Sequence, residues 1–186
     1  MRSNMFVMLF VLMAGLLSTL GCVAGNTDDG LVKYVSPSGG ADFVVDTDKG
    51  EIRYSSTDVV MAAKFCPRDS SYYCIDSAAF HFAVPRHLDA TSKAWEVNSH
   101  KYTINSPLTQ ESIFGNQMDV AVITCQETEK SGAVGTMYYY YSPDRGLLVY
   151  ELVVQWKNSK PESPMSNAPV VSILSTENGL GAKLSD

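Results

Sequence analysis

Histidine and cysteine are the residue types in this chain most able to act as a nucleophile, a general base or a metal ligand. The histidines are His81, His87 and His100, and their spacings match no compact metal-binding motif. No GxSxG nucleophile motif accompanies them, and no cysteine has a histidine as a close neighbour in the sequence. The spacing therefore predicts no catalytic residue, no metal site and no cofactor. Residues from distant strands can still meet in space, so the alternative is a hydrolase with one of these histidines as its base.

Two short segments imitate ligand-binding motifs without meeting their requirements. Asp46-Thr-Asp48-Lys-Gly50-Glu51 alternates carboxylates, but a calcium loop counted from Asp46 needs glycine at Glu51 and an acid at Thr57. Residues 179–182, GLGA, lack the third glycine and the following helix of a dinucleotide-binding fingerprint. We interpret the first segment as a solvated hairpin tip and the second as a turn near the end of the chain.

Four consecutive tyrosines, Tyr138, Tyr139, Tyr140 and Tyr141, form the best candidate for a binding surface. In a strand, alternate side chains point to opposite faces, so one pair should enter the core while the other lies near solvent. Exposed tyrosine rings can stack on a sugar or contact a protein partner. The alternative is that tyrosine is present because it suits β-strands.

The first thirty residues predict export. A basic Arg2 precedes the apolar run Met5–Leu20, which is shorter than the roughly 18 apolar residues that a membrane-spanning helix needs. A short apolar run followed by small residues is typical of a secretory signal peptide. No basic cluster follows it to stop transfer.

The segment STLGC, residues 18–22, resembles the lipobox of bacterial lipoproteins, although Thr19 stands where that family most often has leucine. The resemblance implies that Cys22 carries a thioether-linked diacylglycerol after cleavage behind Gly21, and that the chain is attached to a membrane. Because Val23 rather than aspartate follows Cys22, the resemblance also implies the outer membrane, at its periplasmic face. An ordinary signal peptide cleaved near Ala24-Gly25, with Cys22 lost, is the alternative.

The remaining cysteines fit an oxidising compartment, where a disulfide is expected. Cys66 and Cys74 flank PRDSSYY, a segment able to turn back on itself, and we predict that they form the disulfide. The alternative is Cys74–Cys125. In the favoured pairing, Cys125 is a buried free thiol that packs as a small apolar side chain.

The charge of the chain argues against nucleic-acid binding. The net charge is −6, and no cluster of lysine and arginine occurs. Phosphate backbones are bound by concentrated positive charge, so no nucleic-acid partner is expected.

The elements that must position these side chains are mostly strands. Gly-containing turns at 47–50 and 143–146 predict hairpins, and the apolar run 147–156 predicts a central strand. Ser106 and Pro107 suggest a short helix over 107–112, and residues 86–92 are a second helical candidate. A proline- and serine-rich loop is expected at 158–169. Strands are expected at 31–36, 42–46, 51–55, 59–65, 77–85, 101–104, 119–127, 134–142, 147–156 and from residue 170.

Together, these patterns predict a mainly β fold, with α+β as the alternative. We expect an antiparallel sheet, curled or sandwiched, with one or two short helices. The expected organisation is a signal peptide over 1–21, a polar tether over 22–30 and a single β-rich domain over 31–186. The expected function is that of a lipid-anchored cell-envelope protein with a non-catalytic binding or supporting role in the periplasm, acting on an envelope protein or a glycan.

Overall fold

The computed structural model describes residues 30–37, 42–89, 91–113, 115–128, 133–156 and 169–182. Within these ranges the chain forms strands and no helix, which confirms the mainly β, antiparallel prediction. The strands are β1 (Leu31–Val35), β2 (Phe43–Asp46), β3 (Glu51–Tyr54), β4 (Val60–Ala62), β5 (Lys64–Phe65), β6 (Tyr72–Asp76), β7 (His81–Pro85), β8 (Ala94–Val97), β9 (His100–Ile113), β10 (Asn116–Thr128), β11 (Ala133–Ser142), β12 (Gly146–Trp156) and β13 (Val170–Leu174).

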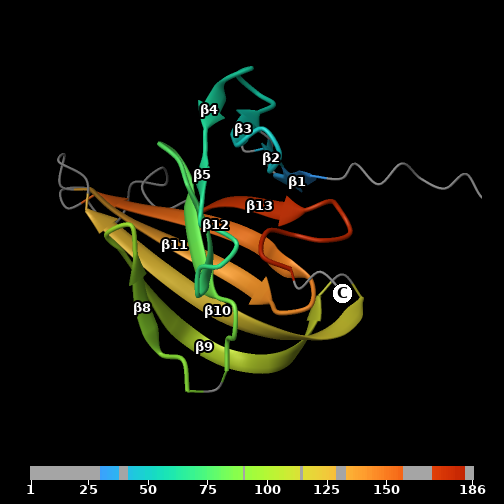
Figure 1. Cartoon of the computed structure of the whole chain (residues 1–186), viewed down its shortest axis with the longest axis vertical. Helices are drawn as coiled ribbons and strands as arrows, with labels where there is room; N and C mark the ends of the chain where they lie inside the picture. Colours follow the sequence, from blue (N-terminus) through green and yellow to red (C-terminus); the bar gives the residue numbers. More distant parts are fainter. Residues whose placement is uncertain are drawn as a thin grey trace, which may run out of the picture.

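Ten of these strands form one curved sheet (Figure 1) in the order β4-β3-β2-β1-β13-β12-β11-β10-β9-β8. Every pairing in the sheet is antiparallel, and β13 joins the two halves by pairing with both β1 and β12. The predicted hairpin at 143–146 connects β11 to β12, and Gly146 adopts a φ of +78°, which favours glycine. The run 147–156 is central, as predicted, because β12 lies between β11 and β13.

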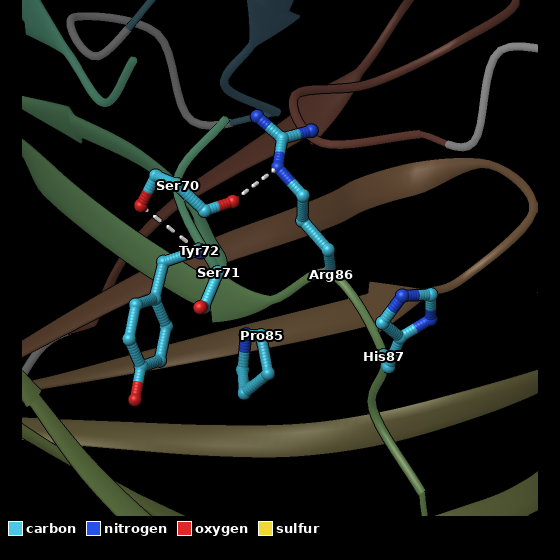
Figure 2. A pocket seen from close by; sticks show the side chains of 6 residues that line it. All are labelled: Ser70, Ser71, Tyr72, Pro85, Arg86 and His87. Carbon is cyan, nitrogen blue, oxygen red and sulfur yellow. Dashed lines mark hydrogen bonds between the residues drawn. The ribbon is translucent and has the colours of Figure 1, made fainter. Parts of the chain in front are cut away.

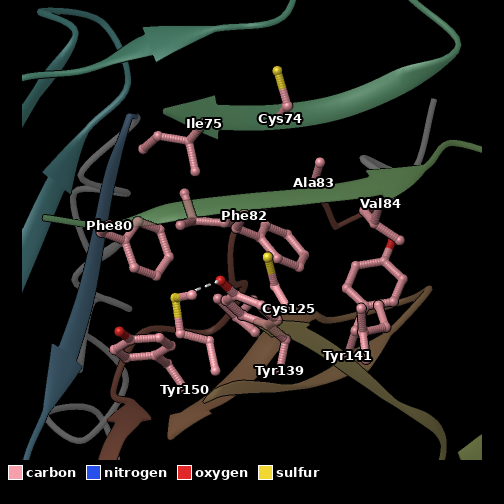
Figure 3. Close-up of a cluster of buried hydrophobic side chains, with 14 of the residues drawn as sticks. Cys74, Ile75, Phe80, Phe82, Ala83, Val84, Cys125, Tyr139, Tyr141 and Tyr150 are labelled. Atoms are coloured by element: carbon pink, nitrogen blue, oxygen red, sulfur yellow. Dashed lines mark hydrogen bonds between the residues drawn. The ribbon is translucent and has the colours of Figure 1, made fainter. Parts of the chain in front are cut away.

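The other three strands form a small sheet, β5-β6-β7, that packs on the large one. Figure 3 shows aromatic rings filling the space between β7 and the large sheet. The Phe80 ring lies edge-on to Tyr150, with centroids 5.2 Å apart, and Phe82 lies 5.2 Å from Tyr139. All four side chains are buried. Each buried aromatic side chain contributes roughly 1.5–3 kcal/mol, so this layer holds the two sheets together.

Two hydrogen bonds fix the position of β7 on the large sheet. The Tyr139 hydroxyl donates to the carbonyl of His81, and Trp95 Nε1 donates to the carbonyl of Ala83 over 3.2 Å. Both donors are buried. A buried carbonyl without a partner costs about 1–3 kcal/mol, so these bonds place β7, and with it His81, at a defined height above the sheet.

The two predicted helices are wrong. Residues 107–112 belong to β9, which pairs with β10 through Thr109–Val120 and Glu111–Met118. Pro107 lies where the register shifts between Ser106 and Thr109, and a β-bulge accommodates a residue that has no N–H to donate.

Residues 86–92 contain a turn rather than a helix. The Asp89 carboxylate accepts hydrogen bonds from the backbone N–H groups of Thr91 and Ser92 at 2.8 and 3.0 Å. An aspartate that bonds the backbone two and three residues ahead stabilises a turn in place of helical hydrogen bonds.

Two predicted strands have different limits. The stretch 59–65 divides at Ala63, whose N–H donates to Gly50, so β4 joins the large sheet and β5 the small one. In the stretch 77–85 the strand begins only at His81. Ser77 Oγ accepts from the N–H of Phe80 at 3.0 Å and donates to its carbonyl at 2.9 Å, which closes a turn before the strand. The strands β6 and β8 were not predicted.

The predicted signal peptide, the tether through residue 29 and residues 158–168 of the predicted loop lie outside the described residues. These assignments stay predictions.

Candidate metal centre

Three side chains from different strands meet at one end of the inter-sheet core: His81 of β7, His100 of β9 and Cys125 of β10. One ligand atom from each lies within 4.8 Å of the others. Cys125 Sγ is 3.7 Å from His81 Nε2, and the two imidazole rings stack with centroids 3.8 Å apart and planes 10° apart. We call His81, His100 and Cys125 the His–His–Cys cluster.

Local sequence positions each member of the cluster. His100 follows Asn98 and Ser99, whose φ angles of 53° and 68° make the tight turn from β8 into β9. This is the left-handed conformation that two-residue hairpin turns require. His81 begins β7 directly after the turn closed by Ser77. In the β9–β10 ladder Cys125 pairs with Tyr102, so its side chain shares the inner face of the sheet.

Two carboxylates form the solvent side of the cluster. Glu127, two residues beyond Cys125 on the same face of β10, places Oε1 2.9 Å from His100 Nδ1 and 3.4 Å from His81 Nε2. Asp76 Oδ1 lies 3.9 Å from His100 Nε2. The Glu127 side chain is 43% exposed, whereas Cys125 is 1% exposed, so the cluster runs from the core outward to a carboxylate rim.

The electrostatic environment keeps the buried members uncharged at neutral pH. Burial, reinforced by the nearby His100, lowers the pKa of His81 to about 4. Burial, reinforced by the Glu127 carboxylate, raises the pKa of the Cys125 thiol to about 11. A neutral imidazole has a free lone pair for a metal, and a metal ion would displace the thiol proton on binding.

The arrangement suits a metal ion better than nucleophilic catalysis. A catalytic cysteine needs a lowered pKa and a partly exposed sulfur, and Cys125 has neither. Two imidazoles and one thiolate are a common ligand set for zinc and copper, with Glu127 available at the rim. Because an imidazole binds a metal in the plane of its ring, one ion shared by both histidines requires the stacked rings to tilt toward each other.

His87, the third histidine, lies apart from this cluster. It lines a surface hollow of about 380 Å³, shown in Figure 2, together with Ser70, Ser71, Tyr72, Pro85 and Arg86. Arg86 Nε donates to the carbonyl of Ser70 over 2.9 Å and closes one side of the hollow. The structure therefore brings two of the three candidate histidines together and leaves His87 exposed at a different place.

The predicted Cys66–Cys74 disulfide is confirmed, with Cα atoms 5.0 Å apart across the β5–β6 hairpin. Its alternative, Cys74–Cys125, is excluded, because Cys125 is a buried free thiol.

The four tyrosines alternate as predicted. Tyr139 and Tyr141 are buried in the core, and Tyr138 and Tyr140 are half-buried on the opposite face of β11. The Tyr140 hydroxyl lies 3.4 Å from a carboxylate oxygen of Glu151 on the neighbouring strand. Their role as a binding surface stays a prediction. Cys22, the predicted lipid attachment site, lies outside the described residues.

Sequence spacing did not indicate the His–His–Cys cluster. The β9–β10 register brings His100 and Cys125 together, and His81 joins them only when β7 docks on the large sheet. One signal was present within the predicted strand 119–127: Cys125 and Glu127 are two residues apart, so both side chains share one face.

Comparison with protein-family models, with curated proteins and with solved structures finds no match to this chain. Across the described residues there is no helix long and apolar enough to span a membrane.

Proposed function

We propose that this chain is a lipid-anchored protein of the bacterial cell envelope whose β-sheet domain binds a metal ion in a non-catalytic role. The observation that carries the metal-binding proposal is the convergence of donor atoms from His81, His100 and Cys125 within 4.8 Å. The location rests on the lipobox-like segment ending at Cys22 and agrees with the disulfide, which belongs to an oxidising compartment.

Burial gives the cluster selectivity for a metal ion over a larger ligand. His81 is 6% exposed and Cys125 1% exposed, and rings of the core pack around them, including Tyr102 at 6.5 Å from the His81 ring. A single ion needs only the donor atoms and a rotation of the two imidazole rings out of their stacked arrangement. Glu127 and Asp76 supply negative charge on the side from which a cation would approach.

Metal binding is tested on the full chain, extracted from membranes in detergent and freed of metal with a chelator. Equilibrium dialysis against Zn²⁺ or Cu⁺ should give one ion per chain. Cys125→Ser and His100→Ala should lose that ion. His87→Ala is the matched control, because it removes a histidine that lies outside the cluster, and it should retain the ion. Equal metal contents in all four proteins would contradict the proposal.

The anchor is tested separately. Cys22→Ser should move the protein from the membrane fraction to the aqueous fraction, because two or three acyl chains are needed for durable membrane attachment. A protein that stays in the membrane fraction after this change would contradict lipidation at Cys22.

A hydrolase is the second candidate, and a specific observation favours it: the cluster contains both a cysteine–histidine contact and a histidine–carboxylate pair. The raised pKa of Cys125 and the lowered pKa of His81 argue against an activated thiolate. Slow reaction of Cys125 with iodoacetamide at neutral pH is therefore expected. Rapid alkylation of the folded protein would favour the enzyme.

An envelope protein or a glycan remains the proposed partner of the tyrosine face. Tyr138 and Tyr140 are the half-buried pair on the face of β11 opposite the core. Replacing both with alanine should abolish cross-linking to the partner in intact cells, and unchanged cross-linking would count against this surface.

A further inference from the structure

A fourth side chain, that of Met137, lies across the sheet from one member of the His–His–Cys cluster. Met137 of β11 is directly opposite Cys125 of β10 in the strand register, and the two side chains are 4% and 1% exposed. Residues opposite each other on one face of an antiparallel pair have Cβ atoms about 4.5–5.5 Å apart. The side chains of Met137 and Cys125 are therefore cross-strand neighbours on the inner face of the sheet.

A second contact places Met137 near His81. Met137 Sδ lies 3.4 Å from the Tyr139 hydroxyl, which donates to the carbonyl of His81. One hydroxyl group, that of Tyr139, therefore links the Met137 sulfur to the backbone of the strand that carries His81. The side chain of Met137 is unbranched and flexible, so it can change rotamer to approach an ion held by the neighbouring Cys125.

We infer that the metal bound at this site is copper in its Cu(I) state, held by His81, His100 and Cys125 with Met137 as an additional sulfur ligand. This inference rests on the proposed metal-binding function. Soft sulfur ligands suit Cu(I), and two histidines with one cysteine and a weakly bound methionine form a ligand set that is characteristic of copper. Zinc is bound in proteins by thiolate, imidazole and carboxylate groups rather than by a thioether.

The net charge of the buried metal–thiolate unit also favours Cu(I) over Zn²⁺. When Cu(I) binds, the Cys125 thiol releases its proton and the copper–thiolate unit is neutral. A Zn²⁺–thiolate unit carries one positive charge, which is costly to bury without a further anion. Glu127 would have to supply that anion, and its side chain lies at the exposed rim, where its Oε1 is 2.9 Å from His100 Nδ1. Glu127 is therefore required for zinc but only orients His100 for copper.

This difference yields a test with two variants and two metals. Met137→Leu removes the thioether at similar volume. Glu127→Gln removes the rim charge but keeps an oxygen that can accept the hydrogen bond from His100. Binding of Cu(I), supplied under argon with ascorbate, is measured by competition with a chromogenic Cu(I) chelator on the metal-free full chain in detergent. Binding of Zn²⁺ is measured by competition with a zinc-sensitive dye.

For Cu(I), Met137→Leu should weaken binding by at least about tenfold, the low end of what altering the surroundings of a metal costs. Glu127→Gln should leave Cu(I) binding within about threefold, because the glutamine oxygen still accepts the hydrogen bond from His100. For Zn²⁺ the order should reverse. Thermal melts of the metal-free variants check that both still fold. As a second readout on the wild-type chain, one equivalent of Cu(I), which is diamagnetic, should shift the Met137 ε-methyl NMR signal by more than one equivalent of Zn²⁺ does.

Three outcomes decide between the possibilities. The expected pattern supports copper. One zinc ion per chain that depends on Glu127, with Cu(I) binding indifferent to Met137, overturns the copper inference and leaves the proposed metal-binding function intact. Failure of both metals to bind, or binding unaffected by Cys125→Ser, overturns both.

Discussion

Replacing Tyr139 with phenylalanine tests whether a buried hydroxyl positions His81. The change removes one oxygen, which donates to the His81 carbonyl and lies 3.4 Å from Met137 Sδ. Tyr139 is 0% exposed, so water is not expected to replace the lost donor. The His81 carbonyl is then left without this partner on the docked strand β7.

The expected loss of stability follows from the unsatisfied His81 carbonyl. Leaving a buried acceptor unsatisfied costs about 1–3 kcal/mol. For a domain of this size each kcal/mol lowers the melting temperature by about 2–4 °C, so Tyr139→Phe should melt roughly 5 °C below the wild type. The same change should weaken metal binding, because β7 carries His81 and would keep only one of its two hydrogen bonds to the large sheet, the bond from Trp95 to Ala83.

The neighbouring Tyr140→Phe variant is the matched control. It removes the same atom from the next residue of β11, but that hydroxyl lies on the half-buried face near Glu151. Its stability should change by no more than about 0.5 kcal/mol. Urea unfolding and metal titration of both variants provide the assay. Equal stabilities of the two variants, or unchanged metal affinity in Tyr139→Phe, would show that the Tyr139 hydroxyl does not position His81.

Three further predictions concern stability. Replacing both Cys66 and Cys74 with alanine should lower the free energy of unfolding by about 2–3 kcal/mol, since the disulfide closes a short loop, and urea denaturation measures the loss; an unchanged urea midpoint would contradict this. Gly179→Ala should cost about 1–3 kcal/mol, because a Cβ there would lie 2.1 Å from a β12 carbonyl oxygen. Gly135→Ala, where the nearest atom is 3.7 Å from the added Cβ, should be nearly neutral, and equal melting temperatures for the two variants would disprove the clash. Finally, the metal-free protein should lose stability as pH falls from about 6.5 to about 4. The pKa of His81 is lower in the folded protein than in the unfolded chain, so the unfolded chain takes up the proton first as pH falls. His81→Phe should reduce that loss by about 3 kcal/mol in urea titrations at pH 7 and pH 4, and an identical pH dependence in the two proteins would count against a buried neutral ring.

The sheet strands were largely predictable, because their residues alternate or form apolar runs between turn residues. The Cys66–Cys74 disulfide was predictable for a related reason: only a short segment separates the two residues. The errors occurred where local signals were overruled by pairing between strands. Ser106-Pro107 reads as a helix start, yet β10 continues to pair beyond it, and the register shift absorbs the proline.

The candidate site was less predictable than the fold. His100 and Cys125 lie on adjacent strands, so their proximity depends on the β9–β10 register. His81 reaches them only through the docking of the small sheet, which depends on two side-chain hydrogen bonds to the β7 backbone. Neither the register nor the docking can be read from residue spacing.

The most direct test of metal binding at this cluster is a crystal structure of the copper- or zinc-loaded protein, with anomalous diffraction collected at the absorption edge of the metal. We expect one anomalous peak between His81, His100 and Cys125, with metal–nitrogen distances of about 2.0–2.1 Å and, for zinc, a metal–sulfur distance of about 2.3 Å. An occupied site elsewhere on the chain, with His81 and His100 still stacked and the Cys125 sulfur free of metal, would contradict it.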